Sequence, residues 1–219
     1  MADESGGHPG RTVGAVISPR RERTRGRLLD AAFDVFARHG VQAASIEAVC
    51  EAAGFTRGAF YSNFASKEEL FLALTERQIR AQLTALEVAT SDVQPAEVGT
   101  RDGIREAVRG IIASVLPDPA AAQSWSVMAL EFELLALRDP QIAARYAEQQ
   151  VRLRDELVGV LERLVGSIGL RFAVDPRTAV DLLLGAFETG QRTALLAGAD
   201  DDRASVLIEA LVDLLVTPA

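Results

Sequence analysis

The chain has 219 residues, of which 48% are hydrophobic, enough to bury a substantial core in one larger domain or in a small domain joined to a larger one. Its single cysteine, Cys50, excludes an internal disulfide, and two histidines far apart in sequence leave little material for a zinc site, so we expect no metal, no cofactor and a reducing cytoplasm. No apolar run approaches the roughly 18 residues of a membrane span, so we expect no membrane partner.

The net charge of −8 argues against a nucleic-acid binder until its distribution is considered. Residues 11–80 carry 11 Lys and Arg against 8 Asp and Glu, whereas residues 81–219 carry 12 against 21. Any contact with DNA is therefore expected from the first eighty residues. Residues 1–19 contain Gly, Ser and Pro without a long apolar signal core, and we predict a disordered leader there.

Apolar residues recur every three or four positions along almost the whole remaining chain, which predicts helices, and no alternating strand pattern competes. Capping residues and glycines mark the ends of these helices. The starts are at Ser45, Thr56, the pair Ser66 and Glu69, and the Asp-Pro pairs at 118–119, 139–140 and 175–176, and the stops are at Gly40, Gly54 and Gly198. We predict about nine helices, at residues 20–39, 45–52, 56–63, 66–90, 101–116, 119–138, 140–169, 176–197 and 203–216.

The predicted fold class is all-α, with two parts of different character. The first three helices are short and closely joined, whereas the later ones are long and amphipathic, which indicates a small unit followed by a larger bundle. We place the first domain at residues 20–80 and the second at 81–219, with the break inside the fourth helix.

Residues 45–64 have the spacing of a helix-turn-helix, with a turn centred on Gly54. In the second helix, Phe60 and Phe64 lie one turn apart and are expected to face the core. That orientation turns Gly58 and Ser62 outward, between Ala59 and Tyr61. A glycine inside a helix costs about 1 kcal/mol relative to alanine, so Gly58 suggests a close approach to a groove floor, unless it is simply tolerated in a short helix.

Lys67 is the only lysine beside 22 arginines, and it lies in the first turn of its predicted helix, where the helix dipole disfavours a cation. A bound phosphate would reverse that penalty, although a solvated lysine, or one against which Tyr61 packs, is the simpler alternative. Upstream, five arginines are expected to form a flexible basic arm that adds non-specific contacts to DNA. They are Arg20, Arg21, Arg23, Arg25 and Arg27.

Residues 25–75 resemble the DNA-binding domain of the TetR family of regulators, and the motif Gly-Phe-Thr-Arg-Gly-Ala-Phe-Tyr-Ser-Asn-Phe at 54–64, followed by Ser-Lys-Glu-Glu-Leu at 66–70, carries the resemblance. The resemblance implies a three-helix DNA-binding domain, a larger helical ligand-binding domain, and dimerisation through the last two long helices. It places Ser45 and Lys67 at DNA phosphates, and it places the helix predicted at 56–63 in the groove. The residues expected to bind DNA are Ser45, Thr56, Arg57, Gly58, Ala59, Tyr61, Ser62, Asn63 and Lys67.

Arg57 is the candidate for a base contact, because its planar guanidinium can pair with O6 and N7 of guanine. A phosphate contact at the rim of the groove is the alternative.

In the second domain, Trp125, Met128 and Phe132 form an apolar stripe on one predicted helix, and Phe187 lies on another. Such stripes are usually core, but some of these side chains, with Glu188 and Gln191 beside them, are candidates for a ligand cavity between helices. Glu131 and Arg192 are further polar candidates, and each is also an ordinary ion-paired or solvated residue. The candidate ligand-binding residues are Trp125, Met128, Phe132, Phe187, Glu188 and Gln191.

The last two predicted helices have apolar residues on more than one side, which suggests a four-helix interface across a two-fold axis. The interface residues that we expect are Leu183, Phe187, Leu207, Leu211 and Leu214. Two-fold symmetry would set two recognition helices about 34 to 36 Å apart and so predicts a palindromic operator.

These observations together predict a homodimeric transcriptional regulator that binds double-stranded operator DNA, most simply as a repressor released by a small-molecule effector. No nucleophile with a nearby base, metal-ligand cluster or glycine-rich phosphate loop indicates an enzyme. The alternative function is a helical module that binds small molecules without sequence-specific DNA binding.

Overall fold

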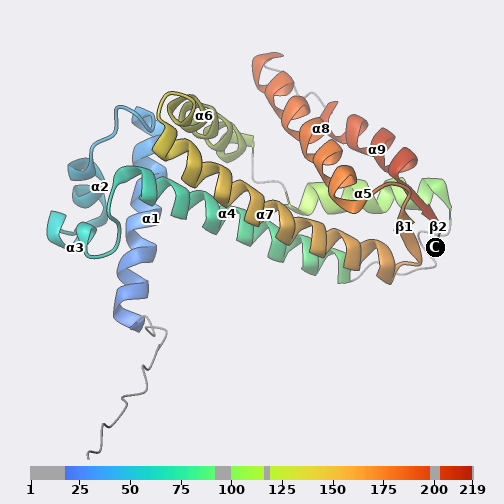
Figure 1. The fold of residues 1–219 in the computed structure, drawn as a ribbon, viewed down its shortest axis with the longest axis horizontal. Helices are drawn as coiled ribbons and strands as arrows, with labels where there is room; N and C mark the ends of the chain where they lie inside the picture. Colours follow the sequence, from blue (N-terminus) through green and yellow to red (C-terminus); the bar gives the residue numbers. More distant parts are fainter. Residues whose placement is uncertain (1–17, 92–99, 116–118, 198–202, 219) are drawn as a thin grey trace, which may run out of the picture.

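A computed structural model describes residues 18–91, 100–115, 119–197 and 203–218. Within these ranges it contains nine helices and two short strands (Figure 1). Residues 1–17 of the predicted leader, the Asp118 cap and the Gly198 stop fall outside the described residues. The leader prediction is wrong for residues 18 and 19, because Ser18 caps the first helix and Pro19 begins it. The elements are α1 (Pro19–His39), α2 (Ile46–Ala53), α3 (Arg57–Tyr61), α4 (Lys67–Ser91), α5 (Arg101–Val115), α6 (Pro119–Ala136), α7 (Pro140–Ser167), β1 (Leu170–Phe172), α8 (Pro176–Ala197), α9 (Arg203–Leu215) and β2 (Val216–Pro218).

The all-α prediction is confirmed, and the caps explain why the short helices begin where they do. Ser45 Oγ accepts a hydrogen bond from the Ala48 N–H at 3.1 Å, and Thr56 Oγ1 accepts one from the Ala59 N–H at 3.2 Å. Between these caps, Gly54 ends α2 in the left-handed conformation, with φ +69°.

The cap of α4 differs in one detail from the box expected at Ser66 and Glu69. Ser66 Oγ accepts from the Glu69 N–H at 3.2 Å, as in a capping box, but Glu69 Oε2 accepts from the N–H of Ala65, one residue before Ser66, at 2.9 Å. Two side-chain hydrogen bonds thus fix the end of the α3–α4 connection at which α4 begins.

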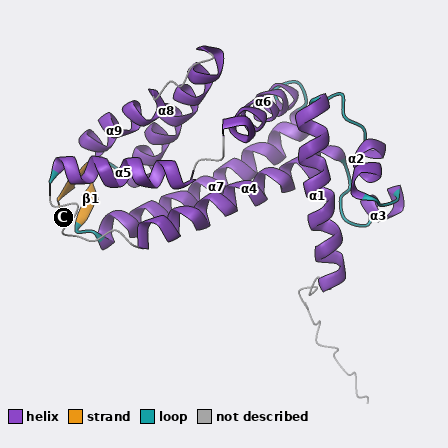
Figure 2. Cartoon of the chain, turned by 180° about the vertical axis from the view of Figure 1, so that it is seen from behind, coloured by secondary structure: helices purple, strands orange, loops and turns teal. Residues whose placement is uncertain are grey.

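The helices form two groups joined by the long pair α4 and α7, as both views show (Figures 1 and 2). Helices α1, α2 and α3 lie at one end, and α5, α8 and α9 lie at the other. The core of the first group contains Phe36, Phe60 and Phe64, all fully buried, and it continues into α6 through Met128 and Phe132. The N-terminal helices therefore share one continuous core with α6.

The second group contains a feature that was not predicted from the sequence, a two-stranded antiparallel sheet. Its strands are β1 and β2, with Leu170 opposite Pro218. The expectation that no strand would form was wrong here. Each strand has three residues, too few for an alternating apolar pattern to be recognised. The pair ties the chain after α7 to the end of α9.

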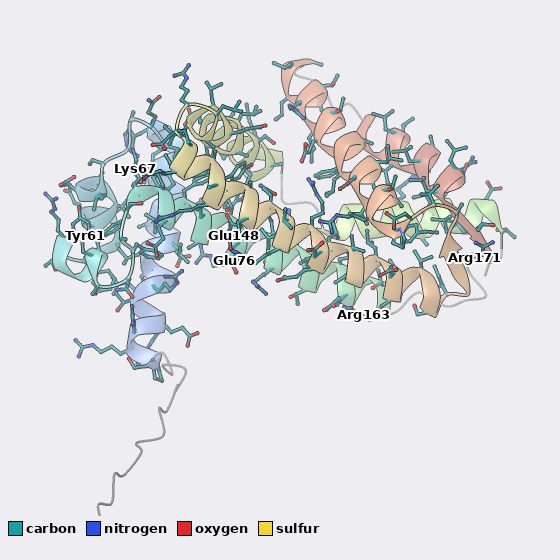
Figure 3. All side chains as sticks on the ribbon, in the orientation of Figure 1. Tyr61, Lys67, Glu76, Glu148, Arg163 and Arg171 are labelled. Atoms are coloured by element: carbon teal, nitrogen blue, oxygen red, sulfur yellow. The ribbon has the colours of Figure 1, made fainter. Side chains whose placement is uncertain are left out.

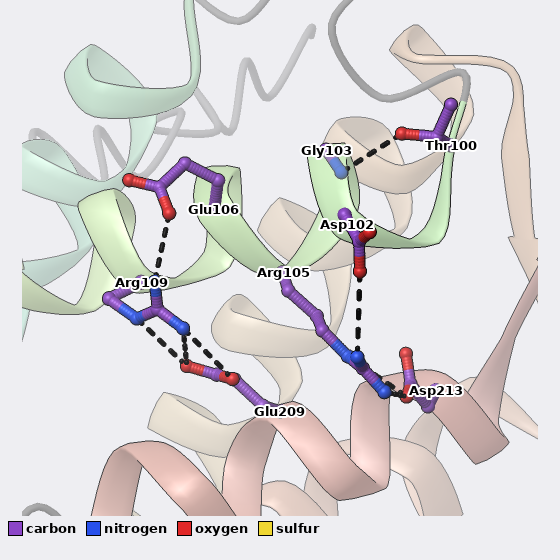
Figure 4. A network of polar contacts seen from close by, with 8 residues as sticks. All are labelled: Thr100, Asp102, Gly103, Arg105, Glu106, Arg109, Glu209 and Asp213. Carbon is purple, nitrogen blue, oxygen red and sulfur yellow. Dashed lines mark hydrogen bonds and ion pairs between the residues drawn. The ribbon is translucent and has the colours of Figure 1, made fainter.

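Ion pairs fasten α5 onto α9 (Figure 4). Arg109 Nη2 lies 3.1 Å from Glu209 Oε1, and Arg105 pairs with Asp213. The two carboxylates are mostly shielded, with side chains 17% and 14% exposed, so these pairs are screened less by water than the surface pairs elsewhere on the chain. In the described part of the chain, no helix is long and apolar enough to cross a membrane.

Candidate DNA-binding surface and ligand cavity

The outer face of α3 has the composition expected of a groove-reading helix. Phe60 and Phe64 are buried beneath it, with exposed fractions of 0% and 1%, while Gly58 and Ser62 point to solvent, as expected. Tyr61 is 49% exposed and packs edge-on against the Phe60 ring. The face is therefore small and polar, with one aromatic side chain at its end.

Arg57 extends from the start of this face and is held by two neighbours. Its Nη1 lies 2.7 Å from Glu47 Oε1 of α2, and its Nη2 donates to the Tyr61 hydroxyl at 3.4 Å. The hydrogen bond with Tyr61 and the charge of Glu47 raise the pKa of Arg57, so the guanidinium remains charged. Its side chain is still 61% exposed, which leaves it accessible to a partner.

Asn63 differs from the expectation that it faces DNA. It is only 8% exposed, and its Nδ2 donates to the Ala59 carbonyl at 2.8 Å, so its amide closes the end of α3 from the inner side. Ser62, beside it, is exposed and donates its hydroxyl to the same carbonyl at 2.8 Å. We therefore leave Asn63 out of the candidate surface and keep Ser62.

The arginines expected in a flexible arm instead belong to α1, and three of them dock on the helix-turn-helix. Arg21 donates to the Ser62 carbonyl at 2.9 Å and Arg25 to the Asn63 carbonyl at 3.2 Å. Arg27 donates to the Ala53 carbonyl at 2.8 Å. Each carbonyl lies at the C-terminal end of α2 or α3, where a cation is favoured by the helix dipole. The prediction of a free arm is wrong for these three residues, which brace the two short helices.

Lys67 reaches back from α4 to the loop that precedes α2. Its Nζ donates to the Gln42 carbonyl at 2.7 Å and to the Ala44 carbonyl at 2.9 Å. These carbonyls offset the unfavourable position of the cation at a helix start and fix the residue before Ser45. An ammonium group has three donors, so one remains for a phosphate. Tyr61 contacts Arg57 and Phe60 rather than Lys67, and Figure 3 shows the two side chains at different places in the unit.

Replacing Lys67 with methionine is expected to weaken binding to operator and to unrelated DNA by the same factor, about tenfold, and to lower the salt slope of binding by about one. The variant loses the phosphate donor and loosens the loop that positions Ser45. Fluorescence anisotropy at several salt concentrations measures both quantities. An unchanged salt slope would refute the phosphate contact of Lys67 and would mean that this residue only positions the loop before α2.

A cavity of about 250 Å³ lies between α4, α6, α7 and α8. Its walls combine aromatic rings with amide and charged side chains. They are formed by Phe71, Thr75, Gln78, Ile79, Gln82, Ala122, Trp125, Ser126, Ala129, Leu130, Glu133, Tyr146, Gln150, Phe187, Glu188, Gln191 and Arg192. An apolar cavity with a few polar groups is the usual form of a small-molecule site. Among the described residues, no group of His, Cys, Asp and Glu is arranged to hold a metal ion.

The structure brings four of the six candidate ligand residues to this cavity, namely Trp125, Phe187, Glu188 and Gln191. Met128 and Phe132 are instead buried in the core, at 1% and 0% exposure, where the Phe132 ring stacks on Phe71 at 4.3 Å. They are corrected to core residues. Tyr146 and Gln150 of α7 were missed, because their helix has no aromatic stripe that would single it out.

The expected dimer residues divide in a similar way. Leu207 and Leu214 are exposed, at 41% and 73%, one above the other on α9. Leu183 and Leu211 are half-buried, and Phe187 lines the cavity. The exposed surface of α8 is centred on other residues, among them Leu182 and Leu196, at 47% and 89%. The structure therefore offers an apolar α8–α9 surface whose details differ from the sequence prediction.

Glu131 does not line this cavity. Its side chain instead links α6 to the turn after α1. Its Oε2 accepts a hydrogen bond from the Val41 N–H at 2.6 Å. Gly40, with φ +79°, lies against the same carboxylate, and a Cβ at this position would approach Glu131 Oε1 to 2.8 Å. The backbone conformation therefore favours glycine at residue 40, and a Cβ there would also displace the Glu131 carboxylate from its place beside Val41.

Replacing Glu131 with alanine is expected to lower the free energy of unfolding by about 1 to 3 kcal/mol, because the partly buried Val41 N–H loses a charged acceptor. Urea denaturation measures the change. Glu131→Gln keeps an acceptor oxygen and should cost less than half as much. The control is Glu148→Ala, which removes an exposed pair with Arg152 and should cost under about 0.5 kcal/mol. Equal losses at 131 and 148 would contradict the link.

Comparisons with known proteins agree with this arrangement over both parts of the chain. The family model described as "Bacterial regulatory proteins, tetR family" matches residues 28–74, and the model described as "BetI-type transcriptional repressor, C-terminal" matches residues 104–217. The protein belongs to the TetR family of bacterial regulators. It is a DNA-binding transcriptional regulator, not an enzyme, and the first match spans the helix-turn-helix described above.

Relatives within the TetR family extend over almost the whole chain. The HTH-type transcriptional repressor AcnR of Corynebacterium diphtheriae is 31% identical over 201 residues, which are 90% of each chain. Among solved structures, a TetR transcription regulator from Haloarcula marismortui has a TM-score of 0.62 at 15% identity, covering 90% of this chain and all of the other. SmeT, the repressor of a Stenotrophomonas maltophilia multidrug efflux pump, has a TM-score of 0.60 at 22% identity, covering 90% and 92%. These two likenesses concern the fold.

Proposed function

We propose that this protein represses transcription by binding a palindromic operator as a homodimer and that a small molecule in the α4–α8 cavity releases it. The observation that carries the proposal is the exposed face of α3, from Arg57 to Ser62, supported beneath by Phe60 and Phe64. The similar AcnR protein is named a repressor, which supports repression here.

Ser45 and Thr56 are proposed to guide the N-terminal ends of α2 and α3 to phosphates, with Lys67 as a third phosphate contact. Gly58, Ala59 and Tyr61 are proposed to lie in the groove. A docked α1 supports this geometry, because Arg21, Arg25 and Arg27 restrain the ends of the two short helices and so reduce the ordering that DNA binding would otherwise require.

Helix α4 supplies the physical route from ligand to DNA. Its first turn carries Lys67, which holds the loop before α2, and its later turns carry Thr75, Ile79 and Gln82, which line the cavity. A ligand that favours a shifted α4 would therefore move the DNA-binding helices, and the population would follow the ligand's differential affinity. We place the boundary between the domains, 20–80 and 81–219, within this helix on the same argument.

The exposed apolar surface of α8 and α9 supports the homodimer. Exposed side chains on these two helices include Leu182, Val206, Leu207 and Leu214. Large apolar side chains exposed together on two packed helices are costly in water and are typical of a subunit interface. A two-fold axis through it would present two copies of α3 to successive turns of DNA.

The test is fluorescence anisotropy of the purified protein with DNA that flanks its own gene, at two salt concentrations and with unrelated duplex as competitor. We expect binding that survives competitor and weakens by orders of magnitude between about 50 and 200 mM salt, since phosphate contacts release counterions. Absence of binding at low salt would favour a helical module that binds small molecules without DNA.

Replacing Arg57 with alanine is expected to cost about 1 to 3 kcal/mol at one operator base pair and to relax the preference there. A selection from randomised half-sites, compared between the wild type and the variant, shows the position. Arg163→Ala, a surface change on α7 (Figure 3), is the matched control. Uniform weakening on all sequences would assign Arg57 to the DNA backbone instead.

A further inference from the structure

The charged side chains around the cavity are unevenly distributed in sign. Only three of the lining residues are charged, namely Glu133 of α6 and Glu188 and Arg192 of α8. Arg192 Nη2 lies 3.5 Å from Glu188 Oε2, and Arg192 Nε also donates to the Glu188 carbonyl at 3.3 Å. The single cation of the wall is therefore already engaged by the carboxylate one turn before it.

Glu133 is left without a compensating charge. Within the parts of the chain that the structure describes, the Glu133 carboxylate has no ion-pair or hydrogen-bond partner, although it borders the cavity. Its charge acts on Tyr146, a partly buried aromatic group rather than a cation. The carboxylate is solvent-exposed at the edge of the cavity, and an unpaired negative charge at the edge of a cavity lined by aromatic rings favours a positive partner.

Aromatic rings from four helices reinforce this preference. Phe71, Trp125, Tyr146 and Phe187 come from α4, α6, α7 and α8 in turn. The face of an aromatic ring carries partial negative charge and attracts cations within about 6 Å. Burial raises the pKa of Tyr146, a hydrogen bond with Gln150 lowers it in part, and the carboxylates of Glu133 and Glu188 raise it further. Its hydroxyl therefore stays neutral, and the same field would repel a bound anion.

The other polar residues of the cavity wall are uncharged, so they add no further preference for the sign of the ligand's charge. Four of the lining residues are glutamines, which can donate or accept without adding charge, namely Gln78, Gln82, Gln150 and Gln191. The cavity volume of about 250 Å³ lies just below the range of about 300 to 1,000 Å³ for ligand pockets in general. The site therefore fits a small molecule rather than a long lipid chain.

We propose that the effector of this protein is a small organic monocation with an aromatic or alkyl body, whose charge lies beside Glu133 and whose body lies against Trp125 and Phe187. This inference rests on the proposed function, in which the cavity is the effector site. It adds the chemical class of the ligand, and it assigns Glu133 as the residue that selects for charge.

Trp125 makes the test direct, because it is the only tryptophan in the sequence and borders the cavity. Its fluorescence is titrated at constant ionic strength with three probes that share a benzene ring: benzyltriethylammonium, benzyl alcohol and benzenesulfonate. We expect the cation to bind at least about tenfold more tightly than the other two. Equal binding of the three probes, tighter binding of the sulfonate, or no response to the cation would each overturn the proposal.

Two variants that change the charge in opposite directions separate selection from a merely structural role. Glu133→Gln should weaken binding of the cation about tenfold and leave benzyl alcohol unchanged. Arg192→Gln should tighten cation binding, since it frees the carboxylate of Glu188, and a damaged fold would not produce such a gain. The control is Glu148→Gln, which removes the same charge outside the cavity (Figure 3) and should change neither affinity.

Each result can be assigned to the inference or to the proposed function, because the fluorescence titration requires no DNA. If the wild type binds its operator but shows no preference for the cation, the inference about ligand class fails and the proposed regulator stands. If the cation is preferred and Glu133→Gln removes the preference, but no operator is bound, the proposed function fails. Unchanged discrimination in Glu133→Gln would overturn the assignment of Glu133.

Discussion

Replacing both Leu207 and Leu214 with aspartate is expected to convert the protein into a monomer that binds its operator at least about 100-fold more weakly. The two leucines lie one above the other on α9 and are 41% and 73% exposed in the single chain. Two charges placed on each copy of this surface would face their counterparts across a two-fold axis, so that four carboxylates would lose water together.

The large effect on operator binding follows from linkage rather than from any lost DNA contact. In a dimer, the second half-site is bound as an intramolecular event, and avidity of this kind is worth about 10² to 10⁴ in affinity. Sedimentation equilibrium measures the association, and fluorescence anisotropy measures the affinity for one half-site and for the complete operator. The monomer should bind both DNAs equally, whereas the wild type should prefer the complete operator.

The matched control introduces the same charges on a different exposed apolar surface. Val127 of α6 and Leu137, which directly follows that helix, are 48% and 78% exposed, and their double replacement by aspartate should leave the association unchanged. A Leu207 and Leu214 double variant that still sediments as a dimer would refute the α8–α9 interface. Dissociation of the α6 control would move the interface to that helix.

The long helices could be predicted from the sequence because their signals are local. Asp139 caps α7 by accepting from the Gln141 N–H at 2.8 Å, and Asp175 caps α8 by accepting from the Thr178 N–H at 3.0 Å, as the Asp-Pro pairs indicated. Most predicted boundaries agree with the structure within two residues. Capping residues and apolar periodicity lie within the helix or within a few residues of its ends, so predicting these helices requires no information about tertiary contacts.

The cavity was predicted only in part, because one apolar stripe serves two purposes. Trp125 and Phe132 lie on the same side of α6 in a helical projection, yet Trp125 reaches the cavity and Phe132 the core. Their separation depends on where α4 and α7 cross α6, which periodicity does not encode. The same holds for Glu131, whose partner Val41 lies 90 residues away in the sequence.

The DNA-binding unit illustrates the same limit in its arginines. The basic composition of α1 was evident, but the docking of Arg25 and Arg27 depends on carbonyl groups at the ends of other helices. Each guanidinium also lies over an aromatic ring, that of Arg25 at 4.3 Å from the Phe64 centroid and that of Arg27 at 4.7 Å from Phe55. The charges alone suggested a mobile arm, but these hydrogen bonds and ring contacts hold the arginines against α2 and α3.

Replacing Gly58 with leucine is expected to abolish operator binding, by a factor of at least about 100, without lowering the melting temperature. A Cβ at Gly58 would have only Thr56 Oγ1 within 4 Å, at 3.7 Å, and the position is exposed. The free protein therefore has room for the side chain, and removing a helical glycine stabilises a helix by up to about 1 kcal/mol. The loss would arise only where α3 meets DNA.

A graded series identifies steric exclusion as the cause. Gly58→Ala adds one methyl group and should weaken binding less than Gly58→Leu, because a groove floor tolerates a small group better than a branched one. Gly110→Leu in α5 is the matched control, since a Cβ there has nothing within 4 Å. It should gain helix propensity without a change in operator affinity. Full operator binding by Gly58→Leu would mean that this face of α3 does not enter the groove, and that the glycine is simply tolerated in a short helix.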